Sequence, residues 1–353
     1  MSEPAQPIPE GRWNEPVWVA VHCSMSRAIV MHGYGPPEVL RLEEVELPAL
    51  AAGEIRVRSL ASPVNHSDLE IRAGNRPIVR EPPFPYVPGL EVVGEVIEAG
   101  SEVDLPIGAR VMTMMQGLGG IRAQRDGGYA EHVTLSAEGV AQIPDGLDPL
   151  EVGALGLAAV TAYLGLSRLG SFAGKRVLVT GAAGGVGSAA VSLARAQGAD
   201  VIGVVSRAEQ VEYVRSLGAS HVVVSKEQSI DEAVEPRSVD RILDTVAGEL
   251  FPQLIRTLRP GGGLSLVGAV GGGDVKFDAW ALLLPMTITG YSSETLDGRS
   301  LRTAVAAICA ALASGDLTPP ARTVFPLAEA AQAHQLLEDH GVEGRVILVP
   351  DDL

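Results

Sequence analysis

Residues 176–187 read RVLVTGAAGGVG and continue into SAAVSLARAQG. The pattern predicts a buried strand over residues 177–180, a glycine-rich turn, and an Ala-rich helix that ends at Gly198. A strand, a glycine turn and a helix in this order bind phosphate, because the helix N-terminus offers unpaired N–H groups and the positive end of its dipole. The stretch therefore predicts a dinucleotide-binding domain.

The turn itself departs from the usual pattern at one position. Ala182 stands where the first glycine is expected, so the match is A-x-G-x-x-G. The glycines that remain let the backbone approach a ligand and let the helix pack close to the strand. The expected cofactor contacts in the turn are Gly184, Gly185, Val186 and Gly187. A turn with only a structural role is the alternative.

Composition argues against several kinds of partner. The 353 residues carry a formal net charge of −16 with no basic run to offset it, which argues against nucleic acid and anionic membrane surfaces. No apolar run approaches the roughly 20 residues of a membrane span, and the N-terminus lacks a signal pattern. Cys23 and Cys309 are too few and too distant for a disulfide framework or a Cys-x-x-Cys metal knuckle. We expect a cytoplasmic protein without a membrane or nucleic-acid partner.

The pattern of residue types changes along the sequence, which predicts two domains. Residues 1–25 are expected to form a disordered N-terminal extension. Over residues 26–150, short β-branched segments separated by Gly and Pro predict a mostly β domain. Over residues 151–292, strands alternate with helices, which predicts a doubly wound parallel α/β sheet. Residues 293–353 contain two helices and two isolated strands. Because isolated strands need a sheet, we assign this segment back to the β domain.

The second strand of the dinucleotide unit, ADVIGVVS, ends at Ser206 and is followed by Arg207. NAD-specific folds usually place an acidic residue there, about 20 residues beyond the glycine turn. A hydroxyl and a guanidinium can instead hold a 2′-phosphate through charge-assisted hydrogen bonds. We therefore predict NADPH as the cofactor, with Ser206 and Arg207 at its phosphate. Arg207 as a solvated residue of the next helical turn is the alternative.

Two further pairs of residues follow predicted parallel strands. Val246 with Ala247 ends the run LDTVA, and Gly268 with Ala269 lies within LVGAV. Ligands bind at this edge of an open α/β sheet, so Val246, Gly268 and Ala269 are expected to line the nicotinamide pocket. Packing turns without ligand contact are the alternative.

Six segments occur in a familiar order: VNHSDLEIRAG, PYVPGLEVVGEV, GGYAEHV, VTAYLGL, VLVTGAAGGVGSAAVSLARAQGADVIGVVS and EGRVILV. Together they resemble the medium-chain dehydrogenase/reductase superfamily, and more narrowly its zinc-free quinone oxidoreductase branch, over nearly everything from Ser26 onward. The resemblance implies a GroES-like catalytic domain beside a Rossmann domain, with the active site in the cleft between them. It also implies a homodimer formed on the sheet edge near residues 287–293, although the same text suits an ordinary edge strand.

The resemblance also implies roles for three residues. Asn65 in VNHSDL would hydrogen-bond near the nicotinamide or the substrate oxygen and is the candidate catalytic residue. Thr161 would contact the cofactor, and the run from Gly344 would close over the nicotinamide. A turn-forming Asn, a helix cap and a plain C-terminal strand are the respective alternatives.

Zinc enzymes of this superfamily carry their catalytic metal ligands where this chain has Asn65, Leu90 and a residue near Leu157. An amide and two leucines cannot form the three-ligand site that catalytic zinc needs.

Three nearby polar residues raise the question of a replacement metal site, but no local spacing supports one. We expect His66 in a partly exposed turn, Asp68 as the polar anchor of the following helical turn, and Glu91 in an internal salt bridge.

The chemistry that remains is direct hydride transfer from NADPH to an apolar acceptor, a quinone or a conjugated enone or enal. A 2-enoyl thioester reductase and a non-catalytic NADPH-binding protein are the alternatives. The tyrosine that related reductases often carry after the Asn motif is replaced at Glu70 and Arg76. The Lys and Tyr that often assist 2′-phosphate binding are Gln210 and Ser225 here.

The acceptor pocket is expected to draw on three weakly patterned stretches, residues 72–85, 112–128 and 280–284. Their apolar candidates are Met114, Met115, Leu283 and Leu284.

Overall fold

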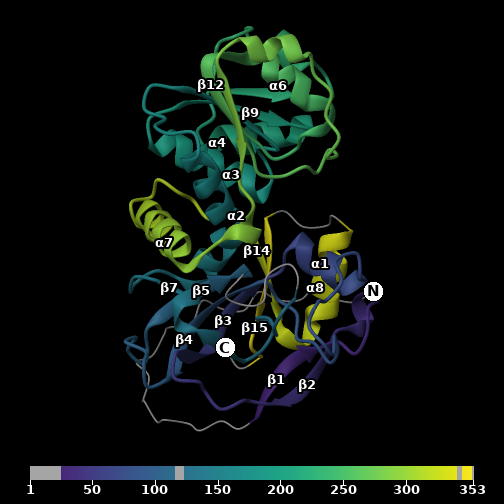
Figure 1. Ribbon diagram of the computed structural model, residues 1–353, viewed down its shortest axis with the longest axis vertical. Helices are drawn as coiled ribbons and strands as arrows, with labels where there is room; N and C mark the ends of the chain where they lie inside the picture. Colours follow the sequence, from purple (N-terminus) through teal and green to yellow (C-terminus); the bar gives the residue numbers. More distant parts are fainter. Residues whose placement is uncertain (1–24, 116–122, 340–343, 352–353) are drawn as a thin grey trace.

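The computed structural model describes residues 25–115, 123–339 and 344–351. The predicted N-terminal extension, apart from Met25, lies outside the described residues, as does Cys23. The molecule is elongated, with one sheet toward each end and helix α2 (Pro149–Ser167) between them (Figure 1).

The wound sheet has six parallel strands in the order β10-β9-β8-β11-β12-β13. The strands are β8 (Arg176–Thr180), β9 (Asp200–Val205), β10 (His221–Val224), β11 (Val239–Asp244), β12 (Leu258–Leu266) and β13 (Met286–Gly290). The helices between them are α3 (Gly185–Ala196), α4 (Val211–Ser216), α5 (Ile230–Ala233) and α6 (Phe251–Thr257). The chain winds to one side from β8 through β9 to β10 and to the other through β11, so the strand order reverses between β8 and β11. Ligands bind at such a reversal, beyond the carboxyl ends of the strands. This arrangement confirms the predicted α/β fold.

The second sheet draws its strands from both ends of the chain. Its order is β14-β15-β3-β4-β5-β7, and β6 also pairs with β3. The strands are β3 (Glu54–Pro63), β4 (Glu91–Ala99), β5 (Arg110–Met114), β6 (His132–Ser136), β7 (Ala141–Gln142), β14 (Arg322–Pro326) and β15 (Arg345–Val349). A separate hairpin joins β1 (Met25–Val30) and β2 (Arg41–Glu46). Because β15 runs antiparallel to β3, with Ile347 opposite Pro63, the C-terminal strand lies beside the residues that lead into α1 (His66–Ala73).

Three helices complete the architecture: α2, α7 (Gly298–Ala313) and α8 (Ala330–Glu338). By length and composition alone α2 could cross a membrane, which differs from the sequence expectation that no apolar run is long enough. However, 67% of its apolar window is buried within the fold. It packs against α3, α7 and β3, so its apolar composition is that of a core helix.

Helix α3 packs unusually close to the turn after β8. At Gly187 an added Cβ would collide with the carbonyl oxygen of Gly181. At Gly185, two residues earlier in the same helix, the nearest atom to an added Cβ would be Cβ of Ala158, at 3.2 Å. The glycine at 187 is therefore the one that this close packing demands.

We expect Gly187→Ala to lower the free energy of unfolding by about 1–3 kcal/mol, because the helix must move away from the turn. Gly185→Ala is the matched control and should change it by less, since the better helix propensity of Ala offsets a mild contact. Denaturant unfolding of both variants measures the difference. Equal losses would contradict the packing argument.

Candidate functional site

A cleft of about 1020 Å³ extends from the carboxyl ends of β8, β9, β10, β11 and β12 to α1 and β15. It lies where the strand order of the wound sheet reverses, as expected for a ligand site. The structure brings most of the predicted site residues to this cleft. They are Asn65, Thr161, Gly184, Gly185, Val186, Gly187, Ser206, Val246, Gly268 and Ala269.

Two predicted residues are not among those that line the cleft. Arg207 is exposed and precedes a short 3-10 turn, where its backbone N–H donates to Oε1 of Gln210 at 3.3 Å. Gly344 adopts a φ of 88° and packs so tightly on the carbonyl of Ala321 that no side chain would fit. Its neighbour Arg345 lines the cleft instead.

Sequence reasoning missed a lysine at the opposite end of the cleft. Lys226 lines it together with Ser206, Gln210 and Ser225. Ser225 and Lys226 follow β10, and β10 pairs in parallel with β9, so the residues after both strands share one edge of the sheet. The predicted strand HVVVS carried this signal, because the residues after a strand next to β9 belong to the same ligand edge.

Buried Asp244, at the end of β11, organises a turn of the cleft wall and was also missed. Its Oδ1 accepts from the Thr180 hydroxyl at 2.6 Å and from the backbone N–H groups of Val246 and Ala247 at 2.9 and 3.1 Å. Ala247 adopts a φ of 57°, a conformation that these bonds stabilise. The carboxylate thus positions Val246, which lines the cleft, while Ala247 itself is buried.

The side chain of Asn65 is held from two sides at the other wall. Asn65 precedes α1, and its Nδ2 donates to Oε1 of Glu91 at 3.0 Å. Nη2 of Arg345 donates to Oδ1 of Asn65 at 3.1 Å and to Oε1 of Glu91 at 2.5 Å. The orientation of the Asn65 amide is therefore set by an acceptor on one side and a donor on the other.

Glu91 is fully buried and confirms the expected internal salt bridge, with Arg345 as the partner. Its Oε2 accepts from the backbone N–H of Leu157 at 2.6 Å. That N–H is available because α2 is broken at Gly156, where φ is 39° and an added Cβ would collide with the carboxylate. Burial raises the pKa of Glu91, while the charge of Arg345 and the hydrogen bond from Asn65 oppose the shift.

Asp68 is the expected polar anchor of α1. Its Oδ2 accepts from the backbone N–H of Asn65 at 2.8 Å, and its Oδ1 accepts from that of Leu90 at 3.0 Å. Burial raises the pKa of Asp68 to about 7, with a further contribution from the charge of Glu91. Within the described ranges, no group of three His, Cys, Asp or Glu side chains is placed to hold a metal ion.

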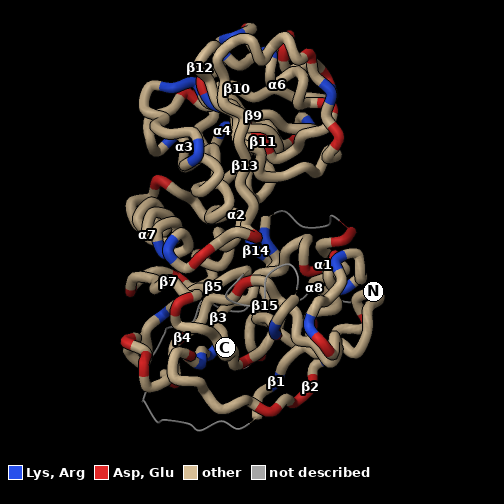
Figure 2. Tube along the Cα trace, viewed as in Figure 1, with Lys and Arg blue, Asp and Glu red and all other residues tan. Residues whose placement is uncertain are grey.

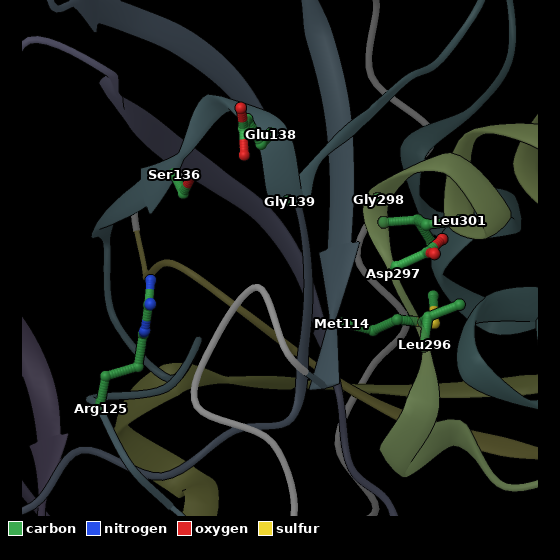
Figure 3. Close-up of a pocket in the computed structure, with 9 residues that line it drawn as sticks. All are labelled: Met114, Arg125, Ser136, Glu138, Gly139, Leu296, Asp297, Gly298 and Leu301. Carbon is green, nitrogen blue, oxygen red and sulfur yellow. The ribbon is translucent and has the colours of Figure 1, made fainter.

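The described residues of the stretches expected to form the acceptor pocket do not line this cleft. Met114 lines a smaller pocket of about 200 Å³, where it points toward Leu296 near the start of α7 (Figure 3). Met115 is buried in the core and Leu283 is exposed to solvent. Residues 116–122 of the second stretch lie outside the described residues. The apolar lining of the cleft comes instead from other positions, which include Leu157, Ala158, Leu250, Leu266, Val267, Val270 and Tyr291.

Both halves of the chain match models of known protein families. Residues 51–145 match the family model described as alcohol dehydrogenase GroES-like domain, and residues 185–307 match the one described as zinc-binding dehydrogenase. A quinone oxidoreductase of Sus scrofa is 31% identical over 91% of this chain and 97% of its own length. A 2-haloacrylate reductase of a Burkholderia species is 29% identical over 92% of this chain and 99% of its own. Among solved structures, a mycobacterial quinone oxidoreductase is similar with a TM-score of 0.81, at 30% identity, over 92% of this chain and all of its own.

We expect Glu91→Gln to lower the free energy of unfolding by about 3 kcal/mol, because it leaves the charge of Arg345 without its buried partner. The matched control is Glu95→Gln on the same strand, whose ion pair with Arg58 is partly exposed and should be worth under about 1 kcal/mol. Denaturant unfolding compares the two variants. A loss at Glu91 no larger than at Glu95 would show that the pair does not support the site.

Proposed function

Because the chain belongs to the medium-chain dehydrogenase/reductase superfamily, in its quinone oxidoreductase branch, we propose that it uses NADPH to reduce quinones or α,β-unsaturated carbonyl compounds. The nicotinamide, when bound, supplies a hydride, and the chain supplies orientation, a dry surface and hydrogen bonds. The observation that carries the proposal is the Asn65 amide, which lines the cleft and is held by Glu91 and Arg345.

The amide of Asn65 suits an acceptor that gains negative charge on oxygen. An amide nitrogen carries two hydrogens, and Glu91 accepts one of them. We assign the second to the acceptor oxygen, where charge develops as the hydride arrives. A donor that is already held in place costs no reorganisation at that moment, which is the condition for effective electrostatic stabilisation. The nearby positive charge of Arg345 polarises the amide in the favourable direction.

The glycine turn fits the diphosphate of a dinucleotide. Gly184 precedes α3, and Gly185, Val186 and Gly187 form its first turn, all of them at the cleft. The first N–H groups of a helix lack intrahelical acceptors, so they are free to meet phosphate oxygens. Thr161 would contact the cofactor from α2, and Val246, Gly268 and Ala269 would border the nicotinamide.

The choice of NADPH is supported by the end of the cleft near β9 and β10. Among the described residues that line it there, Ser206, Gln210, Ser225 and Lys226 offer hydroxyl, amide and ammonium groups and no carboxylate. A 2′-phosphate suits such a set, whereas a free ribose 2′-hydroxyl usually meets an acidic residue. Lys226 therefore takes the leading place that Arg207 held in the sequence analysis, and Arg207 remains a secondary candidate.

A second acceptor class, 2-enoyl thioesters, shares the same chemistry, since hydride adds to a carbon–carbon double bond conjugated with a carbonyl. A relative from Ruegeria pomeroyi, 29% identical over 72% of this chain, is named acrylyl-CoA reductase, which describes reduction of an unsaturated thioester and favours testing this class beside quinones.

We further propose a cytoplasmic homodimer that joins through β13. This strand is at the edge of the wound sheet, and Ile288 on it is 42% exposed. Trp280 and Leu283, just before it, are 75% and 73% exposed, and exposed apolar edges favour pairing with another chain. Acidic and basic residues are interspersed over both ends of the molecule (Figure 2), which supports a small-molecule partner rather than nucleic acid.

We expect Lys226→Ala to raise the KM for NADPH about tenfold or more while leaving that for NADH nearly unchanged, because a charge-assisted hydrogen bond to the 2′-phosphate is lost. Steady-state kinetics with both cofactors measures this, with Arg207→Ala as the comparison. A wild-type enzyme that uses NADH as well as NADPH would overturn the assignment of the cofactor.

We expect the purified protein to oxidise NADPH in the presence of a 1,4-quinone or a conjugated enone. Asn65→Ala should lower kcat about 100-fold, with a smaller change in the dissociation constant for NADPH. Loss of NADPH absorbance across a panel of quinones, enones and 2-enoyl thioesters gives the rates. Tight NADPH binding without turnover of any acceptor would instead indicate a non-catalytic binding protein.

A further inference from the structure

A second group of polar side chains, joined by hydrogen bonds into a chain, lies behind Asn65. The proposed reaction has so far given it no role. Its members are Asp68 and Arg72 on α1, Tyr129 before β6, and His334 and Glu338 on α8. The first four are each 2% exposed or less, and none of the five lines the cleft. Helices α1 and α8 pack against each other, so residues more than 250 positions apart meet here (Figure 1).

The hydrogen bonds in this chain have a defined direction. Nη1 of Arg72 lies 3.4 Å from Nδ1 of His334, and because arginine can only donate, Nδ1 accepts. Burial, aided by the charge of Arg72, lowers the pKa of His334 to about 3, so the ring is neutral and its proton is on Nε2. Nε2 then donates to the Tyr129 hydroxyl at 3.2 Å. The tyrosine hydrogen is left to donate onward. Burial raises the pKa of Tyr129 well above its usual value, and the Asp68 side chain adds to this shift through its charge and as a hydrogen-bond acceptor, so we assign the hydroxyl hydrogen to Asp68.

The other end of the chain is anchored at Arg72. Its Nε donates to the carbonyl oxygen of Gly35 at 3.1 Å, and its Nη2 pairs with Glu338. The guanidinium therefore stays charged and fixed. Because arginine is always protonated, Arg72 can only donate to His334, and this fixes the direction of the hydrogen bonds.

Asp68 connects this chain to the cleft. Its carboxylate accepts hydrogen bonds from the backbone N–H groups of Asn65 and Leu90, and Leu90 is the residue before Glu91. The charge of Asp68 interacts with that of Glu91 on β4 and acts on Tyr86 and Tyr129, while Arg345 on β15 pairs with Glu91. A donated hydroxyl hydrogen favours the ionised carboxylate, which offers an acceptor to each of the two backbone groups.

We propose that Tyr129 and His334 are positioning residues for the reduction: the Arg72–His334–Tyr129 chain directs a hydroxyl hydrogen at Asp68, and Asp68 in turn holds the backbone of Asn65 at the cleft. The proposal rests on the function proposed for Asn65. In this arrangement helix α8, which contributes nothing to the lining of the cleft, supports the residue that faces the acceptor.

The test is the pH dependence of kcat/KM in Tyr129→Phe, which removes only the hydroxyl. In the wild type the rate should fall as the pH drops below about 7, because a protonated Asp68 loses one acceptor. Without the tyrosine donor the ionised form is less favoured, so the fall should begin about one pH unit higher. The value of kcat should decrease, and the dissociation constant for NADPH should not change.

Tyr86→Phe is the matched control. Tyr86 is also buried, and its pKa responds to the charge of Asp68, but it takes no part in the Arg72–His334–Tyr129 hydrogen bonds. His334→Leu should move the fall in the same direction as Tyr129→Phe, and His334→Gln, which retains an N–H donor, should partly restore it. An unchanged profile in Tyr129→Phe, or an equal change in Tyr86→Phe, would overturn the proposal.

Amide hydrogen exchange over residues 64–73 provides a readout that does not depend on turnover. Faster exchange at Asn65 in both Tyr129→Phe and His334→Leu, with no change in Tyr86→Phe, supports the positioning role even if no acceptor is reduced. Unchanged exchange in those two variants overturns it even if the wild type is an active reductase. If Tyr129→Phe does not fold, the two His334 variants decide by the same criteria.

Discussion

The buried carboxylate of Glu91 ties its own strand, β4, to three other parts of the chain. Its partners are the Asn65 side chain ahead of α1, the Leu157 backbone in α2, and the Arg345 side chain on β15. Removing a carboxylate from water costs several kcal/mol, and only a complete set of hydrogen bonds and a counter-charge offsets that cost. The site therefore exists only when the C-terminal strand has paired with β3, and each partner depends on the others.

The two walls of the cleft are built on different principles. The wall next to the wound sheet is mainly backbone, with glycines that permit close approach and one carboxylate, Asp244, that shapes a turn. The information for it is local, since the strand, the turn and the helix follow one another in the sequence. On the opposite wall, the side chains of Asn65 and Arg345 are joined by hydrogen bonds to each other and to the buried carboxylate of Glu91. A polar network of this kind holds one arrangement firmly, because any broken bond leaves a desolvated group without a partner.

Asn65 lies between two carboxylates, and each binds a different part of the residue. Glu91 orients its side chain, while Asp68 binds its backbone N–H. Arg345 offsets the charge of Glu91. Burial raises the pKa of Asp68 to about 7, so its ionisation is clearly opposed by burial. The cleft therefore presents the neutral amide of Asn65, with Glu91 and Asp68 buried behind it and Arg345 beside it at the cleft.

The sequence alone was sufficient to predict the wound sheet, the glycine turn, the strand-end residues Val246, Gly268 and Ala269, and Asn65 through its motif. These signals are local: hydrophobic period, glycine spacing and the residues that follow a strand. Tertiary structure decided which neighbour of a predicted residue reaches the cleft. Gly344 precedes β15 and packs on the carbonyl of Ala321, whereas Arg345 is the first residue of that strand and reaches Asn65 once β15 has paired with β3. Likewise Lys226 lines the cleft because β10 lies beside β9, and Tyr129 meets His334 only because α8 packs on α1. A local pattern can mark the end of a strand, as HVVVS does before Lys226, but which strands and helices lie side by side depends on how parts distant in the sequence pack together.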